Sequence, residues 1–197
     1  MAKNAPIIPI SAQFKYNINY VLDYIVNYIP VPKRQINVNP LMIVIRSFDI
    51  NKPGAQIDDL KGGIAGGSIL QGVLKVGDDI EIRPGIVESK QDGTITCQPI
   101  QTKITSLFAE KNQLLYAIPG GLIGVGTLLD PSFTIADSLV GNIIGYPGKL
   151  PDVFLEIEIE YYLLSRLLGV KQNDNDENQS VQKIQKGEYL LVNIGST

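Results

Sequence analysis

The middle of the chain is divided into short apolar runs by glycine, proline and Asn/Asp clusters, and this pattern restricts it to a β-rich fold. The strand-like runs are 41–47, 67–73, 79–83, 94–99, 101–108, 121–128 and 139–144. Between two of them, Ser89–Gly93 ends in Asp-Gly, a dipeptide typical of tight hairpin turns. We therefore predict a mainly β fold in which residues 41–150 form a closed antiparallel β-barrel, because closure removes exposed sheet edges.

One N-terminal segment has the periodicity of a helix instead. Its apolar residues recur at the spacing of one helix face, at Ile18, Val21, Leu22, Ile25, Val26 and Ile29. Asn17 is suited to cap this helix and Pro30 to end it. Before it, Pro6–Ile10 predicts a short buried strand. One strand and one helix bury too little apolar surface for a domain, so residues 1–32 are expected to be the end of a larger α/β domain. The proline-rich residues 33–40 predict a linker.

Residues 151–197 predict the truncated start of a second β-barrel. Apolar residues and tyrosines from Leu155 to Leu163 alternate with Glu156, Glu158 and Glu160, which predicts a long, half-exposed strand with a solvated acidic face. A helix over 161–168 fits the same residues. The polar run 172–180 predicts a loop or insertion, and 186–194 returns to strand character.

Composition excludes several kinds of chemistry. The chain has no histidine, one cysteine and a net charge of −3. Ser-His-Asp catalysis, imidazole zinc sites and cysteine-rich metal sites are thus excluded. No G-x-x-x-x-G-K-[ST] phosphate loop occurs, so we expect no GTP hydrolysis, no catalytic residue, and no metal or cofactor held by this chain. No apolar stretch approaches the length of a membrane span, so no membrane partner is expected.

Several stretches resemble one family of translation GTPases. The motif Asn4–Gln13, with Ser11-Ala12 at its centre, is similar to the last guanine-contacting motif of such enzymes. The run RSFDINKPG (46–54), followed by DDLKGGIAGGS (58–68), resembles the second domain of the gamma subunit of eukaryotic and archaeal translation initiation factor two. The stretches 119–127 and 161–169 extend the resemblance, which covers nearly the whole chain.

The resemblance implies a fragment of a cytoplasmic gamma subunit: the end of the GTPase domain, the second-domain barrel and the start of a third domain. The parent of such a fragment binds GTP with magnesium. It delivers initiator methionyl-tRNA to the small ribosomal subunit, as part of a heterotrimer with alpha and beta subunits. The alpha subunit is expected on the barrel, and the beta subunit mostly on the GTPase domain.

The same resemblance implies candidate site residues. Ser11, Ala12 and Gln13 correspond to the guanine-contacting motif. For this chain alone an ordinary helix-entry turn is the favoured interpretation, because a base contact without a phosphate site is too weak to hold a nucleotide. The candidates for contact with the tRNA acceptor end are Arg46, Asp58, Asp59, Gly62, Gly63, Gly66, Gly67, Gly120 and Gly121. For the glycine pairs 62–63 and 66–67, bulges and tight barrel corners are the competing explanation.

Two other functions remain open from the sequence. A related GTPase-type carrier, such as the selenocysteine-specific elongation factor, would share the barrel. A ligand-binding β-barrel unrelated to translation would need a deep apolar interior cavity. The absence of tryptophan and an aromatic content of 7% argue mildly against such a cavity.

Overall fold

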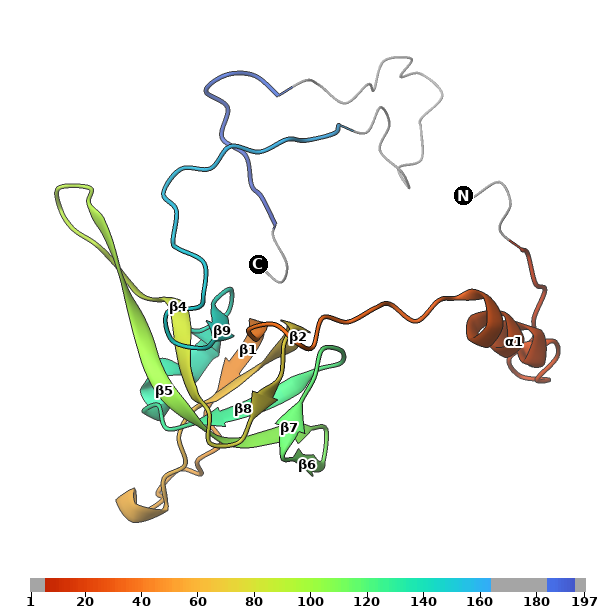
Figure 1. Ribbon diagram of the computed structural model, residues 1–197, viewed down its shortest axis with the longest axis horizontal. Helices are drawn as coiled ribbons and strands as arrows, with labels where there is room; N and C mark the ends of the chain where they lie inside the picture. Colours follow the sequence, from red (N-terminus) through yellow and green to blue (C-terminus); the bar gives the residue numbers. More distant parts are fainter. Residues whose placement is uncertain (1–5, 164–183, 194–197) are drawn as a thin grey trace. The chain divides into compact units, whose positions relative to one another are not determined.

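The computed structural model describes residues 6–163 and 184–193 (Figure 1). It forms two compact units, residues 1–35 and 36–197. Each is described by itself below.

The N-terminal unit contains one helix, α1 (Ile18–Tyr28), close to where the periodicity predicts it. Asn17 occupies the N-cap position but makes no side-chain cap hydrogen bond, so its predicted capping role is wrong. Its Nδ2 donates instead to the carbonyl of Pro9 at 3.0 Å. The helix ends just before Pro30, as expected. None of its residues is buried within the described part of the chain.

The predicted strand at Pro6–Ile10 does not form. Residues 6–10 have no regular secondary structure, and Ile7 is 94% exposed. A strand gains its stability from ladder hydrogen bonds and a covered apolar face. Among the described residues, no neighbouring strand supplies either one to this segment.

The second unit is built on strands that form a closed barrel. Its main elements are β1 (Leu41–Phe48), β2 (Ile64–Gln71), β4 (Asp79–Ser89), β5 (Ile95–Ala109), β8 (Ile123–Thr127) and β9 (Ile143–Gly145). The six strands pair antiparallel in the order β4-β9-β1-β2-β8-β5, and β5 returns to β4 to close the ring (Figure 1). The predicted closed antiparallel barrel is confirmed.

Shorter elements complete the barrel. They are η2 (Ile57–Asp59), β3 (Leu74–Lys75), β6 (Asn112–Leu114), β7 (Tyr116–Ala117), η3 (Pro131–Phe133) and η4 (Ile135–Asp137). The runs 94–99 and 101–108 are a single strand, β5, and residues 139–142 form a turn before β9.

The barrel interior is filled by apolar side chains from every strand. Alternate residues of β1 point inward, so Met42 and Val44 are fully buried, and β2 alternates in the same way. The core also contains Ala65, Ile69, Leu74, Ile80, Ile82, Ile104, Leu107, Ala117, Ile123, Val125 and Ile144. Burying one such aliphatic side chain contributes about 1.5–3 kcal/mol, and the packed interior positions the outward-facing residues of the strands.

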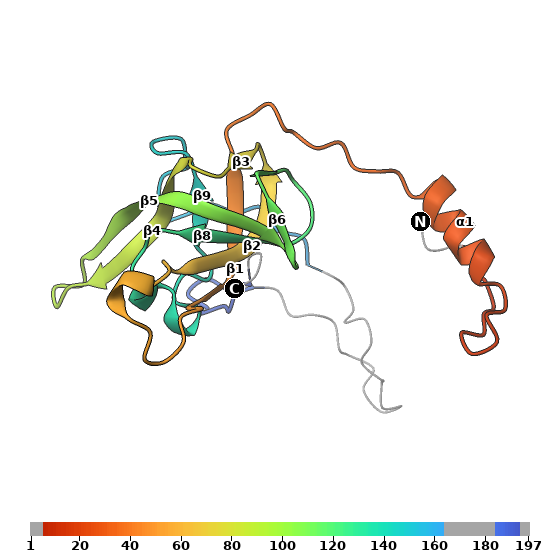
Figure 2. The ribbon, with the colours of Figure 1, turned by 90° about the horizontal axis from the view of Figure 1, so that it is seen from below.

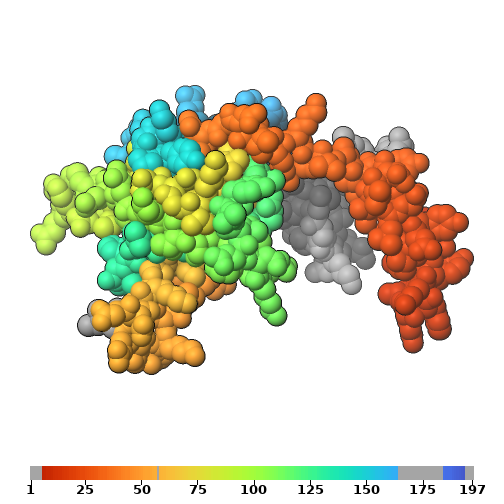
Figure 3. Space-filling model, turned by 60° about the horizontal axis from the view of Figure 1, so that its bottom comes forward, coloured from red at the N-terminus to blue at the C-terminus, as the bar shows by residue number. Residues whose placement is uncertain are grey.

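Two segments project from the barrel. The first joins β1 to β2 and contains η2, and the second is the far end of the β4–β5 hairpin (Figures 2 and 3). The hairpin turn forms where Asp-Gly predicts it: Lys90 N donates to Thr94 O at 2.9 Å, and Gly93 has a φ of +81°.

The chain leaves the barrel past an arginine from β4. The Arg83 guanidinium pairs with Glu81, and its Nη1 donates to the carbonyl oxygens of Leu150 (3.1 Å) and Pro151 (2.9 Å). Glu81 also accepts from the Gly148 amide at 3.0 Å. The ion pair is only 18% and 5% exposed at Arg83 and Glu81, respectively.

Beyond this exit, the predicted strands do not form among the described residues. The alternating segment from Leu155 to Leu163 contains no strand and is exposed to solvent. Residues 184–193 do not form a strand either. Alternation identifies the face that would pack on a partner, and here no described strand pairs with it. The helix considered over 161–168 and the loop predicted at 172–180 lie largely or wholly outside the described residues.

Candidate functional site

The predicted acceptor-end residues do not gather at one place. Gly62 and Gly63 precede β2, whereas Gly120 and Gly121 precede β8, which runs antiparallel to β2. Because Gly67 pairs with Ile123, Gly121 lies near the far end of β2. At ~3.3 Å per residue, roughly 20 Å separate the two glycine pairs along the strand.

Ser11, Ala12 and Gln13 form a tight turn before α1. Ser11 and Tyr16 exchange backbone hydrogen bonds of 3.3 and 3.0 Å, and the Ser11 hydroxyl accepts from the Phe14 amide at 3.3 Å. This turn is the ordinary helix entry that the residues allow, and the guanine-contacting role stays a prediction.

Asp58 and Asp59 lie in the projecting β1–β2 loop, residues 49–63. The side chain of Asn51 closes the neck of this loop, since it pairs with both backbone polar groups of Lys61 at 2.7 and 2.8 Å. Asp49 accepts from the backbone and side chain of Asn51 at 2.8 and 2.7 Å. Asp58 and Asp59 are exposed and form no paired carboxylate site.

Packing inside the barrel explains three of the predicted glycines. A Cβ at Gly62 would lie 2.0 Å from Thr127 O, and one at Gly67 would lie 1.9 Å from Ile43 O. A Cβ at Gly63 would lie 2.4 Å from the Thr134 side chain. These contacts are sterically impossible, so the close approach that glycine permits here is between elements of the barrel itself.

Gly66 belongs to a row of outward-facing residues that crosses four strands. Arg46 on β1 pairs with Gly66 on β2, which pairs with Gly124 on β8, which pairs with Phe108 on β5. Directly opposed residues in antiparallel strands share one face of the sheet. The centre of this row is therefore two adjacent glycines, which we call the glycine patch (Gly66 and Gly124).

The barrel itself does not require glycine at the glycine patch. A Cβ at Gly66 would come no closer than 3.7 Å to any neighbour, and one at Gly124 no closer than 3.8 Å. Both are ordinary van der Waals contacts. Phe48, Ile64 and Phe108 contribute the side-chain atoms nearest to these positions besides Arg46. The patch is thus a partly exposed stretch of backbone bordered by two phenylalanine side chains, where an external group can approach closely.

Arg46, beside the glycine patch, is held by an aspartate from η4. Asp137 Oδ1 accepts from Arg46 Nε at 3.0 Å and from the Ser47 amide at 2.9 Å. These two donors lower the pKa of Asp137, and the Ser47 amide has the larger effect. The Arg46 side chain is nonetheless 70% exposed, so its terminal nitrogens face solvent.

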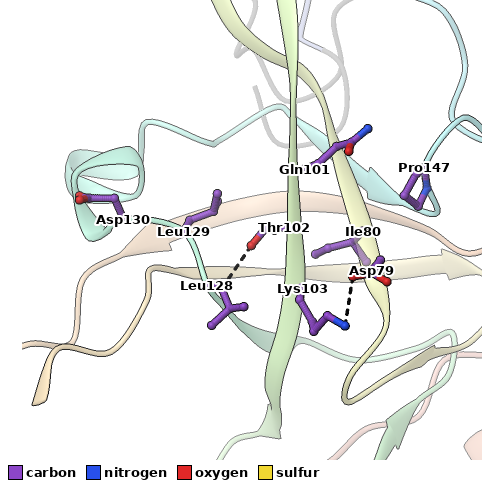
Figure 4. A pocket seen from close by; sticks show the side chains of 9 residues that line it. All are labelled: Asp79, Ile80, Gln101, Thr102, Lys103, Leu128, Leu129, Asp130 and Pro147. Carbon is purple, nitrogen blue, oxygen red and sulfur yellow. Dashed lines mark hydrogen bonds and ion pairs between the residues drawn. The ribbon is translucent and has the colours of Figure 1, made fainter. Parts of the chain in front are cut away.

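A pocket of about 490 Å³ lies elsewhere on the barrel surface, lined by residues of β4, β5 and the segment after β8 (Figure 4). Lys103 Nζ is 3.3 Å from Asp79 Oδ1, and Thr102 Oγ1 accepts from the Leu128 amide at 3.2 Å. Among the residues drawn, Lys103 and Asp79 therefore form an ion pair and Thr102 is bonded to the backbone of Leu128. None of the predicted site residues lines this pocket.

The described residues contain neither a metal-binding cluster nor a membrane-spanning helix. No group of three or more His, Cys, Asp or Glu residues in 6–163 and 184–193 is arranged to hold a metal ion. Within the same ranges, no helix has the length and hydropathy needed to cross a membrane.

Comparison with known proteins identifies the barrel and the segment after it. The family model described as Elongation factor Tu domain 2 matches residues 62–145. The model described as Initiation factor eIF2 gamma, C terminal, matches residues 155–197. A protein of Drosophila melanogaster named "Eukaryotic translation initiation factor 2 subunit 3" is 62% identical over 196 residues, which is 100% of this chain and 41% of that protein.

A second relative, from Schizosaccharomyces pombe, is named "Eukaryotic translation initiation factor 2 subunit gamma". It is 61% identical over 197 residues, 100% of this chain and 44% of that protein. The chain belongs to the initiation factor 2 gamma-subunit family. It spans less than half the length of these two gamma-subunit relatives.

The structure adds three residues to the site that the sequence did not single out, Phe48, Phe108 and Asp137, and it selects Gly124 from the glycine-rich stretch 119–127. Phe48 is the third residue of the RSFD motif, but nothing in the sequence of this gamma-subunit chain marks it as a neighbour of Gly66. Gly124 stands in the run IGVGT, where alternate glycines signal a close approach on one face of a strand. Its pairing partner depends on strand register, which the sequence does not specify.

Proposed function

We propose that this chain is the part of an initiation factor 2 gamma subunit that holds the acceptor end of initiator methionyl-tRNA against its barrel. The glycine patch is the observation that carries the proposal. Single-stranded RNA ends are bound by stacking on aromatic rings and by contacts of phosphates with arginine. Phe48, Phe108 and Arg46 supply these groups around a surface without side chains.

The longer protein would supply the remaining activities. GTP and magnesium binding require a phosphate loop, which this chain does not contain, so we assign them to the rest of the subunit. Delivery of the tRNA to the small ribosomal subunit in the cytoplasm, and docking of the beta subunit, follow from the same assignment.

A separate observation supports alpha-subunit docking on the projecting loop 49–63. The loop is closed at its neck by Asn51, and it exposes Ile50 (44%) and Leu60 (47%). A braced loop with exposed apolar side chains loses little conformational entropy on binding, which favours a protein partner.

The other two functions are less well supported. Both named relatives are initiation factor 2 subunits, which favours initiation over a selenocysteine-specific carrier. The barrel interior is filled by its own apolar side chains, which argues against a ligand bound inside.

The test is titration of the full-length subunit, loaded with GTP, with charged and uncharged initiator tRNA. Gly66→Val places a branched side chain on the glycine patch and should weaken binding of the charged tRNA about tenfold or more. Ser68→Val is the matched control, since it adds bulk on the same face of β2 two residues away. Equal binding by Gly66→Val and wild type would refute the role of the patch. Pull-down with purified alpha subunit tests the loop separately.

A further inference from the structure

We propose that Asp137 is a positioning residue that orients the Arg46 guanidinium to receive a phosphate of the RNA at the glycine patch. The inference rests on the proposed function and adds one residue and one role to it.

The first support is the way the carboxylate is shared. Asp137 Oδ1 accepts at once from the Ser47 amide in the β1 backbone and from Nε of the neighbouring Arg46. The bond to Ser47 fixes the carboxylate relative to the strand. The bond to Arg46 then fixes the guanidinium relative to the carboxylate. The two groups come from positions 91 residues apart, so only the fold brings them together.

The second support is the rigidity of the turn that carries Asp137. Ala136 and Asp137 both have positive φ values, 55° and 58°. Residues with a Cβ adopt this conformation uncommonly, aspartate more readily than alanine, and surrounding contacts help to hold it. Here Thr134 is fully buried with its hydroxyl on Pro131 O at 2.9 Å, and the Leu139 amide donates to Ser47 Oγ at 3.1 Å. The turn is therefore anchored on both sides of Asp137.

The third support is that Asp137 leaves one edge of the Arg46 guanidinium free to bind a ligand. Asp137 uses Nε, and no interaction of Nη1 or Nη2 of Arg46 is found among the described residues. Those two nitrogens form the terminal edge of the planar group and can donate in parallel to two oxygens of one phosphate. Arg46, which carries this free edge, lies directly opposite Gly66 in the pairing of β1 with β2. An arginine held at its Nε loses less side-chain entropy on binding than a free one.

The experiment measures initiator methionyl-tRNA binding to the full-length, GTP-loaded subunit at several salt concentrations. Arg46→Gln should weaken binding about tenfold and reduce the slope of log K against log salt by about 0.7, the value for one lost phosphate contact. Asp137→Ala should also weaken binding and reduce the slope. The double variant should bind no worse than Arg46→Gln alone, because Asp137 acts through Arg46.

Two further variants separate positioning from stability. Asp137→Asn keeps an oxygen acceptor for Ser47 and Arg46, and should restore most of the binding lost in Asp137→Ala. Asp130→Ala removes the cap on the Ser132 amide (2.9 Å) in the preceding turn, η3, without removing a partner of Arg46, so it should leave the salt slope unchanged.

The results distinguish a failure of the positioning role from a failure of the proposed function. If Arg46→Gln weakens RNA binding but Asp137→Ala does not, or if their effects add, the positioning role is wrong and the proposed function stands. If neither Arg46→Gln nor Gly66→Val changes RNA binding, the proposed function itself is wrong. If Arg46→Gln weakens only alpha-subunit binding, Arg46 serves a protein interface, and the inference is overturned.

Discussion

Two hydrogen bonds join the side chain of Asn51 to the backbone of Lys61, in the same way as two paired residues of antiparallel strands bond to each other. Asn51 Nδ2 donates to Lys61 O at 2.7 Å, and Lys61 N donates to Asn51 Oδ1 at 2.8 Å. The side-chain amide has the same donor and acceptor as a peptide group, so it closes the loop as another strand residue would.

Replacing Asn51 by alanine should therefore loosen the loop 49–63 without melting the barrel. We expect faster amide hydrogen exchange at Lys61 and weaker alpha-subunit binding, while the melting temperature changes little, because the loop contributes no core residue. Asn51→Asp is the matched control, since its carboxylate still accepts from Lys61 N but no longer donates to Lys61 O. Unchanged exchange at Lys61 in Asn51→Ala would show that other contacts hold the neck.

Alanine substitutions along β2 should separate glycines required by the barrel from those that are not. Gly67→Ala forces a Cβ to within 1.9 Å of Ile43 O and should destabilise the barrel by about 3 kcal/mol or more. Gly66→Ala meets only ordinary contacts and should leave the free energy of unfolding within about 1 kcal/mol of wild type. Urea denaturation measures both. A large loss for Gly66→Ala would mean that the barrel itself demands glycine there.

Breaking the ion pair at the barrel exit should be costly. Arg83→Gln leaves the Glu81 carboxylate buried without its partner, and we expect a loss of about 3 kcal/mol in the free energy of unfolding. Removing both charges in Glu81→Gln/Arg83→Gln should recover part of that loss, because no buried charge then remains. A double variant less stable than Arg83→Gln would contradict this explanation.

Asp137 should titrate below the ordinary aspartate pKa of 3.8, because the Ser47 amide and then Arg46 favour its charged form. A carboxyl group whose pKa is lowered by folding adds stability above its unfolded pKa, and this stability is lost as pH falls through the folded pKa. The contribution is thus complete at neutral pH and disappears only in acid. Carbon-13 NMR of the side-chain carboxyl in wild type and Arg46→Gln measures the shift. A midpoint at or above 3.8 in wild type would exclude the hydrogen bonds to Asp137 as stable interactions.

Local sequence patterns predicted the elements whose stabilising hydrogen bonds lie within the same short stretch of chain. The six apolar positions from Ile18 to Ile29 identified α1, and Asp-Gly at 92–93 identified the hairpin turn. The strands around Pro6–Ile10 and Leu155–Leu163 failed for the opposite reason. Their composition is suitable, but a strand exists only with a neighbour, and no described strand pairs with either segment.

The candidate site was predictable only in part. The glycines of the run 62–67 were recognised, but the sequence alone left open which of them the barrel itself requires. That distinction depends on atoms of Thr127, Thr134 and Ile43, which reach those positions only through the fold. Gly66 lies beside Gly124 because of the register between β2 and β8. Arg46 reaches Asp137 because the folded barrel brings η4 next to β1.

Arg83 ties the outgoing chain to β4, the strand that continues into the projecting hairpin. The residue lies in β4, just before that strand continues into the hairpin, and its guanidinium grips the carbonyls of Leu150 and Pro151. Leu150 and Pro151 can therefore separate from β4 only if these two hydrogen bonds break, which gives the first residues of the outgoing chain a fixed place on the barrel.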